Sequence, residues 1–141
     1  MTESTTDPST IPPPVQTWHR VAAARDEASL ADLDALLADD CVFRSPAVHT
    51  PQEGKAVTTA YLLAAMAVLG PTLRYLDEWY ADDSAVLEFE CEVGGRSVHG
   101  VDMLRWGADG RLTSFTVMIR PVQGLEAVIA AMGAQLGRKP T

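Results

Sequence analysis

The sequence predicts an α+β fold in which helices cover one face of a curved antiparallel sheet. Apolar residues recur at helical spacing in the first half of the chain and again near its end. Between these regions, residues 73–120 alternate between apolar and polar side chains, and Gly94-Gly95 and Asp109-Gly110 mark hairpin turns. One face of this sheet is apolar and needs cover. If the sheet curls around the helices, a cavity is left.

Length and charge limit the classes of function. The 141 residues are enough for one domain with a real core. A formal net charge of −8 makes nucleic acid and anionic membranes unfavourable partners. No apolar run reaches the roughly 18 residues of a membrane span, and no signal peptide is evident. We therefore expect a cytoplasmic protein that binds neither nucleic acid nor a membrane.

No cofactor or metal is predicted. The three histidines, His19, His49 and His99, lack the spacing of metal ligands, and no glycine-rich phosphate loop is present. Cys41 and Cys91 do not form a C-x-x-C pair. We expect both cysteines to be small buried hydrophobic residues.

The N-terminal half predicts three helices and one strand behind a disordered tail that is rich in Ser, Thr and Pro. We expect Ser29 to cap the second helix, with Asp32 adding an acid to its first turn. The third helix is apolar nearly all round and should be largely buried. These elements are expected at residues 1–14 (tail), 15–27 (first helix), 30–38 (second helix), 41–45 (strand) and 55–69 (third helix).

The C-terminal half predicts a meander of four strands, at residues 73–80, 85–93, 98–106 and 112–120, and a final helix at 122–136. Strand parity places Ala85, Leu87, Phe89, Cys91 and Val93 on one apolar face. The final helix carries one apolar stripe and much alanine. It either closes the pocket or contacts a partner. The single domain is thus predicted to span residues 15–137.

Asp102 is the main functional candidate. It shares a strand face with Gly100, Leu104 and Trp106, so one acid lies among apolar neighbours beside a glycine that leaves open space. On the next strand Thr113, Phe115, Val117 and Ile119 share a face. Burial would raise the pKa of the Asp102 carboxyl and make it a pocket acid or base. Alternatively, Asp102 is a structural acid tied to Arg25 or Tyr61.

Three segments carry a resemblance to a known family: residues 36–46 (LLADDCVFRSP), Gly54-Lys55, and the hairpin of 101–106 and 109–112. From Val15 to about Arg120 the chain resembles the nuclear transport factor 2-like superfamily, which includes ketosteroid isomerases and SnoaL-type polyketide cyclases. The resemblance implies a cone-shaped barrel, built by the curved sheet around the N-terminal helices, and a homodimer. It does not define the function, because the superfamily contains many chemistries and several non-enzymes.

The resemblance also assigns roles to positions. The isomerases place a general-base aspartate directly before the proline of the first strand, which is Ser45 here. Their oxyanion tyrosine falls on Val21, and their second oxyanion donor, a protonated aspartic acid, falls on Asp102. Isomerisation by the family mechanism is therefore disfavoured. Asp102 acting on a carbonyl-bearing substrate, with His49 at the pocket rim, is one hypothesis. A non-catalytic ligand-binding protein and a structural dimerisation module are the others.

Two surfaces follow from these interpretations. Ser45 is expected to bond either a ligand or its own backbone, and Tyr61 to meet the ligand or fill the core. The outer sheet face mixes acids and arginines with Val101, Met103 and Met118, which favours an interface with a second copy. The residues expected around a small apolar ligand are Trp18, Val21, Phe43, Ser45, Tyr61, Leu87, Phe89, Leu104, Phe115 and Val117.

Overall fold

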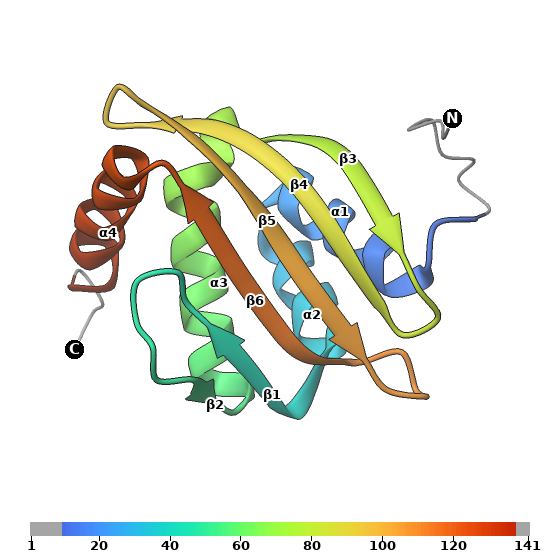
Figure 1. Ribbon diagram of the computed structural model, residues 1–141. Helices are drawn as coiled ribbons and strands as arrows, with labels where there is room; N and C mark the ends of the chain where they lie inside the picture. The colour runs from blue at the N-terminus through green and yellow to red at the C-terminus, as the bar shows by residue number, and fades with distance from the viewer. Residues whose placement is uncertain (1–9, 138–141) are drawn as a thin grey trace.

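The computed structural model describes residues 10–137 and has the α+β architecture that the sequence predicts. The helices lie on one side of a curved sheet, and α4 lies beside α3 at one end of it (Figure 1). The elements are α1 (Pro13–Ala24), α2 (Glu27–Leu36), β1 (Leu37–Arg44), β2 (Gln52–Glu53), α3 (Lys55–Leu69), the 3₁₀ helix η2 (Gly70–Thr72), β3 (Arg74–Tyr80), β4 (Ser84–Val93), β5 (Arg96–Trp106), β6 (Leu112–Arg120) and α4 (Val122–Gly137).

The sheet is mixed and not purely antiparallel. Its strand order is β2-β1-β6-β5-β4-β3, and the meander from β3 to β6 is antiparallel as expected. However, β1 pairs parallel with β6 and antiparallel with the short β2, a strand that the sequence did not indicate. Because β3 and β2 stay at opposite edges, the sheet curls around the helices without closing. This open, curved sheet is the expected cone.

The N-terminal region corrects two predictions. Residues 1–9 of the predicted tail lie outside the described residues, but Pro13 and Pro14 already belong to α1, since proline is favoured in the first helical turn. The cap of α2 is Asp26 and not Ser29. The carboxylate of Asp26 accepts from the Ser29 backbone N–H at 3.0 Å, and the Ser29 hydroxyl accepts from the Asp26 N–H. These bonds form a capping box that starts the helix earlier than predicted.

Irregular pairing changes which residues face inward at the end of the β5–β6 hairpin. The register shifts between Arg105 and Trp106, so that Trp106 pairs with Leu112 while Arg105 pairs with Ser114. Leu112 is consequently buried, and Thr113 is exposed rather than inward-facing. The alternation along β4 is confirmed at every predicted inward position.

Gly100 does not leave open space beside Asp102. A Cβ atom at this position would lie 2.4 Å from the Met118 carbonyl oxygen and 2.7 Å from Cζ of Phe89. The Phe89 ring therefore occupies the room that the missing side chain provides. Gly100 allows the ring of a neighbouring strand to pack against the sheet backbone.

We expect Gly100→Ala to destabilise the fold by about 1–3 kcal/mol through overpacking, because the backbone of β6 cannot move away without breaking its pairing. Gly107→Ala is the matched control, since its Cβ would meet no atom closer than 3.6 Å. Chemical denaturation measures both free energies of unfolding. Equal stabilities of the two variants would contradict this account of Gly100.

Candidate functional site

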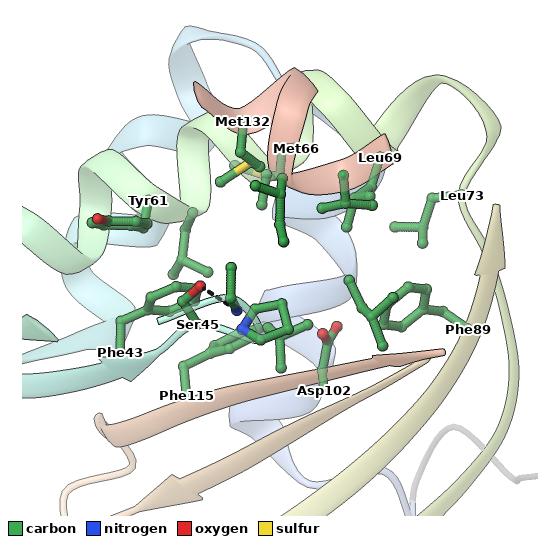
Figure 2. Close-up of a pocket in the computed structure, with 18 of the residues that line it drawn as sticks. Phe43, Ser45, Tyr61, Met66, Leu69, Leu73, Phe89, Asp102, Phe115 and Met132 are labelled. Atoms are coloured by element: carbon green, nitrogen blue, oxygen red, sulfur yellow. Dashed lines mark hydrogen bonds between the residues drawn. The ribbon is translucent and has the colours of Figure 1, made fainter. Parts of the chain in front are cut away.

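A cavity of about 210 Å³ lies between the inner face of the sheet and the helices α3 and α4. Figure 2 shows Met66, Leu69 and Met132 across the cavity from Asp102 and Phe115. Four aromatic side chains form part of its wall: Phe43 stacks on Tyr61 with ring centres 5.3 Å apart, and Trp18 meets Phe115 edge-on at 4.8 Å. The cavity is lined almost entirely by apolar side chains. Of the residues expected there, those that line it are Trp18, Phe43, Ser45, Tyr61, Phe89, Asp102, Phe115 and Val117.

Three residues expected around the ligand do not line the cavity. Val21, Leu87 and Leu104 are fully buried in the packed core instead. Strand parity correctly turned Leu87 and Leu104 inward. It could not distinguish the part of the interior that the helices fill by close packing from the part that stays open.

The C-terminal helix closes one side of the cavity. The residues of α4 that line it are Val128, Ile129, Met132, Gly133 and Leu136. The opposite side of the opening is the loop after β1. Val48 from this loop and Ile129 from α4 both line the cavity and are 42% and 44% exposed. Side chains that touch both the cavity and solvent mark its mouth, which therefore lies between this loop and α4.

Of the two roles considered for Ser45, the bond to its own backbone is present, and His49 does not line the cavity. His49 is exposed and directly follows Val48 in the loop after β1. Ser45 lines the cavity, but its hydroxyl oxygen accepts a hydrogen bond from the Ala47 backbone N–H at 3.0 Å, drawn as a dashed line in Figure 2. This bond shapes the turn at Pro46.

Asp102 is the one formally charged side chain among the described residues that line the cavity. Only 5% of it is exposed. The Tyr75 hydroxyl donates a hydrogen bond of 2.5 Å to its Oδ2 atom, and the Trp18 indole N–H donates to the Tyr75 oxygen at 2.8 Å. The other oxygen, Oδ1, bonds no group of residues 10–137. A chain of donors thus runs from α1 through β3 to β5 and leaves Oδ1 without a partner among the described residues.

Tyr75 was not identified from the sequence, and neither Arg25 nor Tyr61 is tied to Asp102. Arg25 ends α1 in a left-handed conformation, with its side chain beside Gly70. Tyr75 reaches Asp102 because it pairs with Phe89 on β4, whereas Asp102 pairs with the neighbouring inward residue, Leu87. The two inward side chains are diagonal across β4. The available sequence signal was a tyrosine in a predicted edge strand, but its register was unknown.

Burial dominates the electrostatics of the pair. It raises the pKa of Asp102 from 3.8 to about 7, although the Tyr75 hydrogen bond and the charge of His19 oppose this rise. Burial and the nearby Asp102 hold the pKa of Tyr75 well above its usual value of 10. Tyr75 therefore remains a donor, while Asp102 exists in both charge states near neutral pH. Neutral Asp102 can donate to a ligand oxygen, and ionised Asp102 can accept a proton.

Other reactive groups are not placed at this cavity. Residues 10–137 contain no cluster of three or more His, Cys, Asp or Glu side chains that could hold a metal ion. Cys41 and Cys91 are buried as expected, and burial raises the pKa of each thiol to about 11. Over the same range, no helix is both long and apolar enough to span a membrane.

A family model and two solved structures are similar to most of this chain. A family model described as a SnoaL-like domain matches residues 15–115. A steroid delta-isomerase from Pseudomonas aeruginosa is 38% identical, with 88% of this chain and 89% of that chain covered and a TM-score of 0.82. An uncharacterized protein with a cystatin-like fold from Silicibacter pomeroyi is 27% identical, with 92% and 89% covered and a TM-score of 0.83.

More distant structures agree in fold. An NTF2-like protein of unknown function from Mesorhizobium loti is 20% identical, with 77% and 91% covered and a TM-score of 0.63. No match was found among curated proteins. The cone-shaped fold is therefore shared with proteins of both named and unknown activity.

We expect Asp102→Asn to remove a pH-dependent loss of stability. Between about pH 4 and 7 the unfolded chain releases the Asp102 proton while the folded chain keeps it, so stability falls as the pH rises through this window. The shift from 3.8 to about 7 corresponds to roughly 4 kcal/mol. Above pH 7 both states are ionised and the difference stays constant.

Urea denaturation of both proteins at pH 4.5, 6 and 8 measures this effect. Asparagine keeps an oxygen that accepts from Tyr75, and all other titrating groups are common to the two proteins. The free energy of unfolding of the natural chain should fall below that of the variant as the pH rises. Parallel pH profiles would show that Asp102 titrates normally.

Proposed function

This chain belongs to the SnoaL-like domain family, and from that premise we propose that it binds a small apolar molecule through a carbonyl oxygen. In this proposal, protonated Asp102 donates a hydrogen bond from Oδ1 to the ligand oxygen. Apolar walls enclose the remainder of the ligand. The same hydrogen bond would let Asp102 act as an acid on the carbonyl oxygen of a substrate.

The observation that carries the proposal is the donor chain that ends at Asp102. Tyr75 donates to Oδ2, and Trp18 in turn donates to the Tyr75 oxygen; these bonds hold the carboxyl group in one orientation and leave Oδ1 for the cavity that Asp102 lines. Buried polar groups normally have partners. A carboxyl group that keeps its proton near neutral pH and has one oxygen without a protein partner is suited to a ligand acceptor.

The chemistry that fits this contact is enolisation. A hydrogen bond from Asp102 becomes stronger as negative charge develops on the carbonyl oxygen, so it stabilises an enolate-like transition state more than the bound ketone. The loss of the carbon-bound proton needs a base. Among the described residues that line the cavity no second carboxylate, imidazole or amine is present. The proposal therefore assigns to Asp102 the polarisation of the carbonyl group and assigns the role of base to none of the described residues that line the cavity.

The relatives support the class of substrate and not the full mechanism. The relative from Pseudomonas aeruginosa is a steroid delta-isomerase, which supports an apolar ring system as ligand. The position of the family's general-base aspartate is Ser45, whose hydroxyl accepts from its own loop. A hydroxyl group is a poor base at neutral pH. We therefore propose that Asp102 binds and polarises a carbonyl group. An isomerase mechanism that pairs Asp102 with a general-base aspartate is disfavoured.

We expect 2-cyclohexen-1-one to bind more weakly as the pH rises above about 7, by roughly tenfold per pH unit, because ionised Asp102 cannot donate. Asp102→Asn retains an N–H donor at every pH, so its affinity should be independent of pH. Asp102→Leu should lose the preference for the enone over cyclohexene. Calorimetric titration measures these affinities, and a natural protein whose affinity rises with pH would contradict the donor role.

The same ligand separates catalysis from simple binding. Proton NMR in deuterium oxide follows exchange at the carbon positions activated by the carbonyl. Faster exchange with the natural protein than with Asp102→Leu supports enolisation. Binding without faster exchange supports the non-catalytic alternative, a protein that stores or relays its ligand.

We also propose that the outer sheet face binds a second copy of the chain. Trp79 and Met118 are 55% and 54% exposed on this face, and the pairing register sets Val101 beside Met118 and Val86 beside Trp79. The charged side chains Glu90 and Arg120 lie beside His99 at one end of this face, and Arg105 lies beside Ser84 at the other end. A dimer with a two-fold axis through the apolar patch would bury the patch and leave these charges at the rim of the interface.

Met118→Glu should convert such a dimer into monomers, because it buries a carboxylate in the apolar part of the interface. Thr113→Glu, at an exposed position of the same strand but away from the patch, is the control. Sedimentation equilibrium reads the mass directly. A natural chain that is monomeric at micromolar concentration, or a dimer unaffected by Met118→Glu, would exclude this interface.

A further inference from the structure

A partly buried ion pair lies outside the cavity, on the far side of Tyr75. His19 Nε2 is 2.6 Å from Glu78 Oε2, and the Tyr80 hydroxyl donates to Glu78 Oε1 at 2.5 Å. The side chains of His19 and Glu78 are 29% and 12% exposed, so solvent screens their charges only in part. None of these three residues lines the cavity, and the proposed function uses none of them.

A bulge in β3 turns Glu78 toward the helices. Tyr75 and Glu78 are three residues apart, yet they pair with Phe89 and Leu87, which are two residues apart on the inward face of β4. One extra residue on β3 is therefore accommodated, as in a β-bulge. With regular pairing, Tyr75 and Glu78 would point to opposite faces. The bulge brings the carboxylate of Glu78 to the same face as Tyr75 and Asp102.

Helix α1 holds Tyr75 with two consecutive side chains. Trp18 donates to the Tyr75 oxygen, and the His19 ring meets the Tyr75 ring edge-on at 4.8 Å. The donor to Asp102 is thus in contact with the ion pair on one side and with the cavity on the other. Moreover, Glu78 and Asp102 pair with the same residue of β4, Leu87. Their backbones are therefore two strand spacings apart, about 10 Å.

We propose that His19 and Glu78 control the charge state of Asp102 from outside the cavity. The pair is a positioning element, since neither residue reaches the ligand space. Its consequence rests on the proposed function, because the charge of Asp102 decides whether that residue donates to a ligand carbonyl.

The two charges act on Asp102 in opposite directions. Burial raises the pKa of Asp102 most, the charge of His19 lowers it, and the charge of Glu78 raises it. Burial also disfavours the charge of Glu78, but the hydrogen bonds from His19 and Tyr80 hold the pKa of Glu78 below its usual value. Glu78 therefore stays ionised. A substitution that removes the positive charge of His19 leaves the negative charge of Glu78 unbalanced, so Asp102 should then keep its own proton to higher pH.

The remaining groups near Asp102 do not supply a competing charge. The titratable groups that act on it are His19 from α1 and Tyr75 and Glu78 from β3. From β4, Cys91 remains a neutral thiol because burial raises its pKa to about 11. From α3, the cavity receives the neutral hydroxyl of Tyr61. The residues of β6 and α4 that line the cavity are all uncharged.

Carbon-13 NMR of the ligand-free protein, labelled at the carboxyl carbon of aspartate, measures the titration midpoint of Asp102 directly. Asp102→Asn identifies the resonance. One unit charge at about 10 Å changes the acid dissociation constant of a buried group by roughly tenfold, or about one pH unit in the midpoint. We expect Glu78→Gln to lower the midpoint by this amount and His19→Gln to raise it.

Two further variants separate charge from structure. His19→Lys keeps a positive charge beside Glu78, so its midpoint should stay at or below that of the natural protein. Arg20→Gln removes a positive charge from the next, exposed position of α1 and should leave the midpoint nearly unchanged, because solvent screens it.

The proposal is supported if the titration midpoint of Asp102 rises in His19→Gln and falls in Glu78→Gln, and if His19→Lys does not show the rise. Equal midpoints in all four variants, or shifts in the same direction in both glutamine variants, overturn it. The NMR measurement needs no ligand, so it decides this inference even if 2-cyclohexen-1-one does not bind. If either glutamine variant fails to fold, the comparison of His19→Lys with Arg20→Gln still tests the charge: a higher midpoint in His19→Lys than in Arg20→Gln overturns the proposal.

Discussion

The hydrogen bond from Tyr75 to Asp102 is the contact on which the arrangement of the site depends. It joins β3 to β5 across the inner face of the sheet, and the Trp18 indole extends it to α1. A buried carboxyl group without a donor would destabilise the fold by several kcal/mol. The bond from Tyr75 therefore stabilises the docking of α1, β3 and β5 against one another. The same bond fixes the orientation of Asp102, whose second oxygen has no partner among residues 10–137.

The cavity lies where the side chains between the sheet and the helices no longer fill the interior. Phe89 fills the space above Gly100, and Val21, Leu87 and Leu104 pack into a dense core. Beyond them the cavity stays open between the sheet and α3, and α4 covers one side of it with residues that include Val128. An acid that is buried at the edge of such a space lowers stability when it ionises. Functional sites commonly carry costs of this kind, because a pocket needs polar groups where the core would prefer apolar ones.

Local patterns predicted the regular elements well, and they failed where a residue count was irregular. The bounds of α3 and the alternation along β4 follow from periodicity and from the glycines that flank α3. The bulge after Arg105 exchanged Thr113 for Leu112 on the inner face, since one extra residue reverses strand parity. The bulge in β3 likewise concealed that Glu78 faces inward.

The sequence by itself determined that Asp102 is a buried acid on the apolar face of a strand, because strand parity depends only on neighbouring residues. It also determined the α+β class and most of the aromatic wall of the cavity. Only the tertiary structure decided that Tyr75, and neither Arg25 nor Tyr61, is the partner of Asp102, and that α4 closes the cavity. These features depend on which strands pair, in which register, and on how helices dock, and those are contacts between residues far apart in the chain.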